Sequence, residues 1–186
     1  MRDGGVAKSL TATNGVMVYA AGRVTSIGVT SDGQGATSGI GAIGAAVQTD
    51  AGSLTLNSGG NSGPDGDIYV TDISATTLKK VTTDASGQII ELSALSWDIN
   101  DGVAAGIGDT ADTVKISATG GDIAYTAGTI AAATLTLDAS GAIGASGAGN
   151  SVTTNAGLLT LTSGGDIYIS DSYTGGSTLD VLTTVV

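Results

Sequence analysis

Apolar and polar residues alternate over short stretches of this chain, and the stretches recur. Residues 114–116, 135–137 and 159–161 read Val-Lys-Ile, Leu-Thr-Leu and Leu-Thr-Leu, and residues 179–181 read Leu-Asp-Val. In an extended strand this alternation places apolar side chains on one face and polar side chains on the other. The pattern therefore predicts short strands that each bury one face.

The starts of these four stretches follow a regular spacing. From Val114 to Leu135, Leu159 and Leu179 the separations are 21, 24 and 20 residues. A strand-built solenoid uses about 20–30 residues per coil, and glycine-containing corners follow the first three stretches. We predict an all-β fold, a right-handed parallel β-helix (β-solenoid) of about 20–24 residues per coil, because crossover connections between parallel strands are right-handed.

We treat residues 1–186 as a single β-solenoid segment with no clear linker, less regular in 1–113 and regular in 114–186. The coil register in about 77–113 stays open, because the phrases at 81–89 and 91–99 lie too close together for one coil each. In the second phrase Trp97 stands where glycine precedes Asp-Ile elsewhere. Lys79 and Lys80 suggest an exposed sheet edge that blocks further pairing.

A longer repeat has a period of about 100 residues. Gly41-Ala-Ile-Gly44 returns as Gly141-Ala-Ile-Gly144, Leu54-Thr-Leu56 returns as Leu159-Thr-Leu161, and Asp-Ile-Tyr occurs at residues 67 and 166. Tandem antiparallel β-sandwiches, whose domains have about 100 residues, are the alternative fold. The finer period and the single proline favour the solenoid.

Composition excludes several kinds of chemistry. The chain has no Cys and no His, so it has no disulfide, no thiol nucleophile, no Cys/His zinc site and no Ser-His-Asp relay. Its net charge of −11 would repel nucleic acid. The apolar stretches are too short to span a bilayer, so we expect no membrane insertion, and no signal peptide is visible after Met1.

Two sets of side chains are candidate sites. Tyr69, Tyr125 and Tyr168 each follow an Asp-Ile pair and form either a ladder that packs on sugar rings or a set of ordinary packing residues. Asp65 and Asp67 are weak calcium candidates, and solvated turn carboxylates are the simpler interpretation of these and of Asp98, Asp101, Asp109 and Asp112. We expect no required cofactor.

The phrases at 54–60, 114–123 and 159–169 resemble the repeats of filamentous-haemagglutinin-type bacterial surface adhesins and related giant repeat proteins. This resemblance covers about the last three quarters of the chain. It implies a parallel β-helix, an extracellular or cell-surface location, and a role as a stalk, adhesin or fibre. Glycans or cell-surface receptors are then the expected partners.

The leading functional hypothesis is a non-enzymatic extracellular structural repeat segment of an adhesin, stalk or self-assembling filament. The chain ends on an apolar strand, so we expect an assembly edge at Leu179, Val181, Val185 and Val186, where copies join end to end or a longer chain continues. The alternative is a carbohydrate-binding β-solenoid module. A β-helix polysaccharide-degrading enzyme is the third hypothesis, although no basic residue lies beside a clustered Asp pair.

Overall fold

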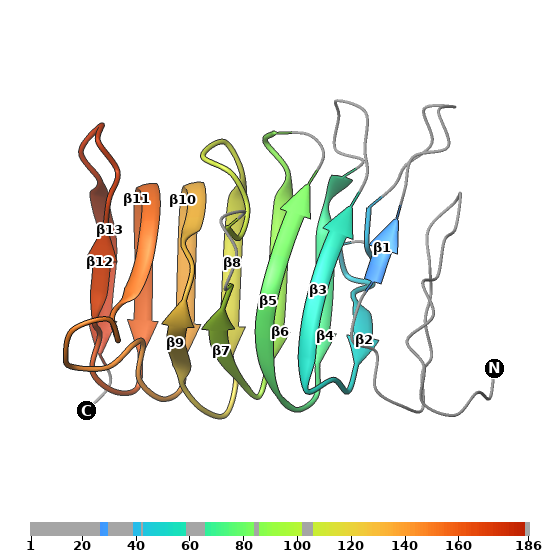
Figure 1. Cartoon of the computed structure of the whole chain (residues 1–186), viewed down its shortest axis with the longest axis horizontal. Helices are drawn as coiled ribbons and strands as arrows, with labels where there is room; N and C mark the ends of the chain where they lie inside the picture. Colours follow the sequence, from blue (N-terminus) through green and yellow to red (C-terminus); the bar gives the residue numbers. More distant parts are fainter. Residues whose placement is uncertain are drawn as a thin grey trace.

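The fold is a stack of parallel strands. The computed structural model describes residues 27–29, 39–41, 43–58, 66–83, 86–101 and 106–184. All strand pairings among these residues are parallel, and the strands lie side by side along one long axis (Figure 1). The predicted β-solenoid is therefore confirmed, and antiparallel sandwiches are excluded for the described residues.

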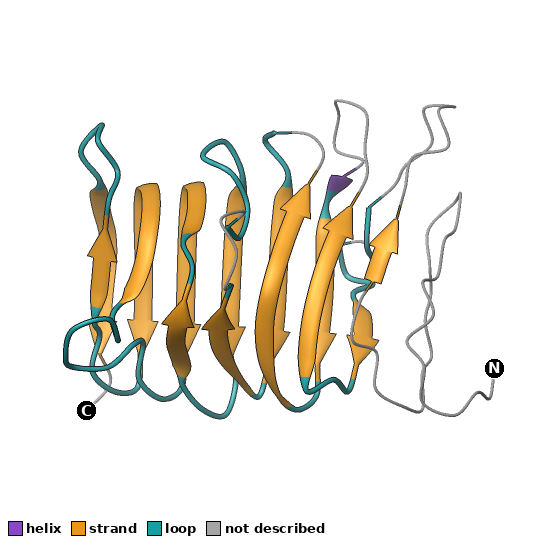
Figure 2. Cartoon of the chain, in the orientation of Figure 1, coloured by secondary structure: helices purple, strands orange, loops and turns teal. Residues whose placement is uncertain are grey.

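The strands form two sheets joined by loops at the two edges of the stack (Figure 2). The five-stranded sheet contains, in spatial order, β1 (Ile27–Val29), β3 (Ser53–Ser58), β5 (Ala75–Thr83), β7 (Ser96–Asn100) and β9 (Ile123–Ala127). The eight-stranded sheet contains β2 (Val47–Thr49), β4 (Ile68–Asp72), β6 (Ile89–Ala94), β8 (Thr113–Ala118), β10 (Ile130–Ala139), β11 (Val152–Ser163), β12 (Ile169–Asp171) and β13 (Thr178–Thr184). β12 pairs with the first part of β11, and β13 pairs with its second part.

One column of paired core residues shows the coil length directly. It runs through Ile68, Ile90, Val114, Leu135, Leu159 and Leu179. The separations are 22, 24, 21, 24 and 20 residues, so these positions mark five turns of the solenoid. The spacing predicted from residue 114 onward is confirmed, and the same spacing extends back to Ile68.

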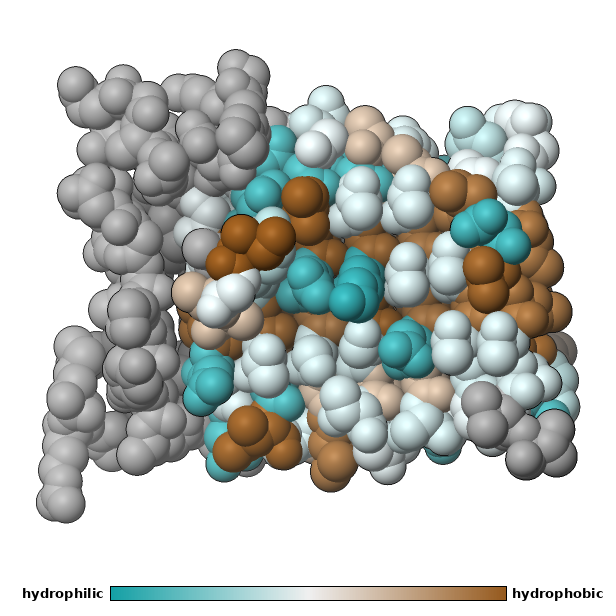
Figure 3. Space-filling model, turned by 180° about the vertical axis from the view of Figure 1, so that it is seen from behind, coloured by the Kyte–Doolittle hydropathy of each residue, from teal (hydrophilic) through white to brown (hydrophobic). Residues whose placement is uncertain are grey.

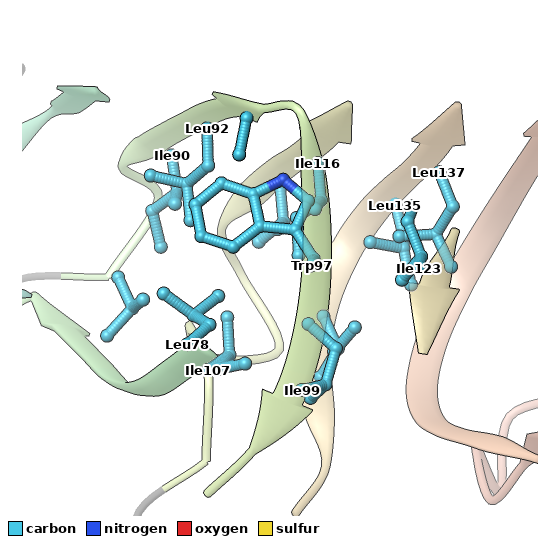
Figure 4. Close-up of a cluster of buried hydrophobic side chains, with 14 of the residues drawn as sticks. Leu78, Ile90, Leu92, Trp97, Ile99, Ile107, Ile116, Ile123, Leu135 and Leu137 are labelled. Carbon is cyan, nitrogen blue, oxygen red and sulfur yellow. The ribbon is translucent and has the colours of Figure 1, made fainter. Parts of the chain in front are cut away.

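The core follows from the alternation of residue types. In β7, β8 and β11 buried side chains alternate with more exposed ones over most of each strand, as the period of a strand requires. The buried set consists mainly of Ile, Leu, Val and Ala, together with Trp97. Figure 4 shows the indole ring of Trp97 extending through the interior toward Ile90 and Leu92 of the other sheet. Its Nε1–H donates to the Ser117 carbonyl oxygen at 3.0 Å.

The register within 77–113 is now defined. Val81 lies in a column with Leu56, Ile107 and Ile130, whereas Ile90 continues the column of Leu135. Trp97 pairs with Ile123, so the tryptophan replaces a core isoleucine rather than a corner glycine. The suggestion of an edge at Lys79 and Lys80 is wrong, because β5 pairs with β3 on one side and β7 on the other.

The long sequence repeat is a structural repeat turned to the opposite face. We call residues 40–83 the first copy and residues 143–184 the second copy. Leu54-Thr-Leu56 lies in β3 of the five-stranded sheet, but Leu159-Thr-Leu161 lies in the eight-stranded sheet. Ile40 starts the column that contains Ile68, and four turns along this column lead to Leu135. Ile143, which begins the second copy, lies half a turn later and pairs with Ile123 on the opposite face of the stack. The copies are thus separated by about four and a half turns.

Candidate assembly edge

The last described turn exposes a complete strand. We call β12 and β13 together the C-terminal rung. All seven residues of β13 are exposed, and among the described residues β13 pairs only with β11. Leu179 is 50%, Val181 41% and Leu182 56% exposed. Figure 3 shows hydrophobic residues gathered at this end of the stack.

The predicted assembly edge is placed here in part. Leu179 and Val181 lie in β13, whereas Val185 and Val186 lie outside the described residues. Sequence reasoning missed Leu182. A register shift between Leu159 and Thr160 brings Leu182, and not Val181, opposite Leu161. The signal was present, because Thr178-Leu-Asp-Val-Leu-Thr-Thr184 matches Thr77-Leu-Lys-Lys-Val-Thr-Thr83, whose strand carries the same shift.

A partly buried carboxylate holds the turn that leads from β12 into β13. Asp171 accepts hydrogen bonds from the Thr154 hydroxyl at 2.6 Å, the Ala156 N–H at 3.1 Å and the Tyr173 N–H at 3.2 Å, and also from the Ser177 hydroxyl. Burial acts to raise the pKa of Asp171, but the hydrogen bonds outweigh it and hold the pKa below its ordinary value. The ionised side chain therefore fixes the start of the exposed strand.

The structure does not bring the three predicted tyrosines into one column. Tyr69 lies in β4 of the eight-stranded sheet and is only 7% exposed, whereas Tyr125 lies in β9 of the five-stranded sheet. The hydroxyl of Tyr69 donates to Asp67 at 3.3 Å, and burial, followed by the charge of Asp67, raises the pKa of Tyr69. Tyr168 donates in the same way to Asp166 at 3.4 Å. Tyr69 and Tyr168 are equivalent positions of the two copies rather than stacked neighbours.

The candidate calcium ligands that the structure describes accept hydrogen bonds within the fold. Asp65 lies outside the described residues. Asp67 accepts hydrogen bonds from the Ile89 N–H at 2.8 Å and from Tyr69, and Asp98 accepts one from Thr126 at 2.9 Å. In the part of the chain that the structure describes, no three acidic side chains gather as a metal site would require.

Asp109 and Asp112 form a further turn. Asp109 accepts a hydrogen bond from the Ala111 N–H at 2.7 Å. Asp112 accepts from the Gln88 N–H at 2.8 Å and the Asp109 N–H at 3.0 Å. Burial nevertheless raises the pKa of Asp112, because removal from water disfavours the charged form. Both carboxylates are thus used within the fold. Asp101, also among the predicted acids, is buried.

A shallow groove crosses the outer face of β5, β7 and β9. Its volume is about 400 Å³, and Thr77, Ser96, Asp98 and Asp122 supply most of its polar lining. Trp97 forms part of the floor but is only 2% exposed, so it offers little ring surface to a sugar. The groove therefore offers hydroxyl and carboxylate groups but no exposed aromatic platform.

Comparison of the chain with family models, curated proteins and solved structures gives no match. Within the described residues, no helix is long and apolar enough to cross a bilayer. The fold and its exposed rung are therefore the observations on which a function can be argued.

Proposed function

We propose that this protein is a non-enzymatic structural repeat segment of an extracellular adhesin, stalk or filament, and that its C-terminal rung joins copies end to end. The observation that carries the proposal is the full exposure of β13, with the apolar side chains of Leu179, Val181 and Leu182 and a free strand edge. A parallel sheet grows by adding strands, and an open edge is a ready template for another chain.

The rest of the surface supports this proposal. Among the described residues, the outward positions of the sheets carry mainly Thr, Ser and Asp, and Lys115 forms an ion pair with Glu91 at 2.9 Å. The net charge of −11 favours solubility and disfavours lateral association of like-charged rods. Attraction is then concentrated at the apolar end, which favours linear over lateral growth. The cell-surface location follows from the resemblance to adhesin repeats.

The test measures association over a wide range of protein concentration, by sedimentation velocity and negative-stain imaging. The wild type is expected to form elongated oligomers. Leu182→Lys places a charge in the apolar patch and is expected to shift the protein to monomers. Ile43→Lys is the matched control, because Ile43 is 81% exposed but lies on a loop far along the chain. A wild type that stays monomeric throughout, or equal effects of the two changes, would contradict the proposal.

Glycan binding is the second candidate, favoured by the hydroxyl and carboxylate groups in the groove over β5, β7 and β9. The groove offers hydroxyl and carboxylate groups at the spacing of neighbouring strands, about 4.8 Å. A glycan array with the wild type, Asp98→Ala and Tyr168→Ala distinguishes binding in the groove from binding at Tyr168. Loss of binding in Asp98→Ala alone assigns the groove, and absence of binding to any glycan removes this candidate.

A further inference from the structure

The C-terminal rung has a counterpart inside the same chain, in β4 and β5. In the first copy Leu54 pairs with Leu78, the register then shifts, and Leu56 pairs with Val81. In the second copy Leu159 pairs with Leu179, the register shifts at the same place, and Leu161 pairs with Leu182. The two strands therefore share sequence pattern, partner type and bulge, although they lie in different sheets.

The corners that precede these strands begin at equivalent aspartates, but the second corner is longer, because four residues lie between Asp72 and Thr77 and six lie between Asp171 and Thr178. Asp72 accepts hydrogen bonds from the Thr49 hydroxyl at 2.6 Å and the Ala51 N–H at 2.9 Å. Asp171 accepts from Thr154 at 2.6 Å and Ala156 at 3.1 Å. The backbone follows, because Ile73 N–H donates to the Thr49 oxygen at 3.0 Å and Ser172 N–H donates to the Thr154 oxygen at 2.8 Å. The second copy thus reproduces the support of the first.

The two copies differ in what covers them. In the first copy β6 pairs with β4, through Ile68 with Ile90 and Val70 with Leu92. β7 pairs with β5, through Thr76 with Trp97 and Leu78 with Ile99. Ile107, which follows β7 in the chain, pairs with Val81. Leu78 and Val81 are consequently 0% exposed, whereas their counterparts Leu179 and Leu182 are 50% and 56% exposed. The chain itself therefore shows what a covered version of the C-terminal rung looks like.

We propose that the C-terminal rung is a docking site for a parallel coil of the β6–β7 type, supplied by a second molecule. The incoming segment places an Ile-x-Leu-x-Ala strand on β12 and, after a one-residue corner, a Trp-x-Ile strand on β13. Its corner N–H donates to the Tyr173 oxygen, as the Leu95 N–H donates to the Ser74 oxygen at 3.1 Å in the first copy. The inference rests on the proposed function, since it specifies the chemistry of the partner at the same end.

The rung is specific for an incoming coil whose first strand fits β12 and whose second strand fits β13. A strand on β12 alone would leave Leu179 and Leu182 uncovered, and a strand on β13 alone would leave the corner open. The register shift in β13 requires an incoming strand whose apolar residues continue past the bulge, as Ile99 and Ile107 do over Leu78 and Val81. A sequence that lacks the apolar pair equivalent to Ile90 and Leu92, or the pair equivalent to Ile99 and Ile107, cannot cover both strands of the rung.

The test uses a fluorescently labelled synthetic peptide with the sequence of residues 86–108, which includes Ile99 and Ile107, added to the full chain. Saturable binding is expected, measured by fluorescence anisotropy. A peptide with Leu92→Lys and Ile99→Lys is expected not to bind. In the protein, Leu182→Lys is expected to weaken binding by about tenfold or more, as substitution at the centre of an interface does, while Ile43→Lys is expected to leave it unchanged.

A second format removes the entropic cost of bringing two molecules together. Residues 86–108 are appended after Val186 through a flexible linker, which raises their effective concentration at the rung. Hydrogen exchange at β13 is expected to slow relative to the same fusion carrying Leu92→Lys and Ile99→Lys. No binding in either format, or binding that Leu182→Lys leaves intact, overturns the inference.

The two proposals fail separately. If the wild type forms elongated oligomers but the peptide does not bind, end-to-end association stands and the β6–β7-type partner is wrong. If the peptide binds at the rung but the wild type remains monomeric, the partner chemistry stands and self-association is wrong.

Discussion

The glycine that follows the first isoleucine of each copy gives the sharpest test of the structure. Gly144 has φ of +69°, and a Cβ added there would lie 2.5 Å from the Tyr168 carbonyl oxygen. Gly41 has φ of +74°, and a Cβ there would lie 2.5 Å from the Tyr69 oxygen. Gly44 has φ of +73°, but a Cβ there would meet nothing within 4 Å. The structure therefore pairs Gly144 with Gly41, whereas the sequence motif pairs it with Gly44.

The expected magnitudes differ because only two of these sites are crowded. A left-handed φ costs an alanine about 1–2 kcal/mol, partly offset by about 0.4–1 kcal/mol because alanine restricts the unfolded chain. Gly44→Ala should thus destabilise by about 1 kcal/mol or less. Gly144→Ala and Gly41→Ala add a clash with a backbone oxygen held in a strand pairing, and overpacking of this kind costs a further 1–3 kcal/mol or so.

Urea denaturation followed by far-ultraviolet circular dichroism and by the fluorescence of Trp97 measures the difference. Trp97 is the one tryptophan of the chain and is buried, so its emission reports exposure of the core. Gly144→Ala and Gly41→Ala should both lower the midpoint by clearly more than Gly44→Ala. Equal losses for Gly44→Ala and Gly144→Ala would refute the structural pairing of the copies.

Three further changes test the corners and the surface. Asp72→Ala leaves the Thr49 hydroxyl and the Ala51 and Ser74 N–H groups without their acceptor. The free energy of unfolding should therefore fall by about 3 kcal/mol. Asp50→Ala, at an exposed position nearby, should change the free energy of unfolding little in the same urea titration. Urea midpoints measured from pH 7 to pH 3 should first rise, because the pKa of Asp112 is raised in the folded state and protonation of Asp112 then favours folding. Below about pH 4 the midpoints should drop, because the pKa values of Asp72 and Asp171 are lowered and their protonation removes charge-dependent hydrogen bonds. A steady fall of the midpoint from pH 7 would contradict this. Glu91→Gln should cost less than about 1 kcal/mol, since the Glu91–Lys115 pair is largely exposed, and a larger loss would show that the pair fixes strand register.

The regular half of the chain was predictable because its core columns are uninterrupted. Val114, Leu135, Leu159 and Leu179 are the actual partners in neighbouring strands, and the alternation alone identified them. The loop at 144–151 did not disturb the count, because it leaves the stack between Ile143 and Val152 and returns to the same side.

The register of 77–113 could not be derived from the sequence for two physical reasons. The bulge in β5 adds a residue between Leu78 and Val81, which breaks the alternation on which the prediction depends. Trp97 occupies a core column that continues through Ile123, Ile143 and Ile167, so the shared Asp-Ile phrase places Ile99 against Ile123, two residues out of register. Both features are local exceptions to a regular pattern, and only the backbone pairing resolves them.

The candidate site was predictable as an edge but not in its details. Apolar residues at Leu179 and Val181 indicated an exposed strand, whereas the contribution of Leu182 depends on the bulge. The tyrosines failed as a ladder because each half of a coil has the same alternation. A phrase such as Asp-Ile-Tyr therefore fits either sheet equally well, and the sequence does not show which face it occupies.

Comparison of the two copies separates what a half-coil determines by itself from what its neighbour determines. Backbone pairing, the bulge and the hydrogen bonds to the corner aspartate are alike in both copies, so they follow from the local sequence, although the corner itself is two residues longer in the second copy. Burial is not alike: Asp72 is 3% exposed in the covered copy, whereas Asp171 is only partly buried at the open rung. The rung is therefore already in the conformation that a covered strand adopts. A docking coil would order itself on a preformed template, and the main cost of association would be the ordering of the incoming segment rather than rearrangement of β12 and β13.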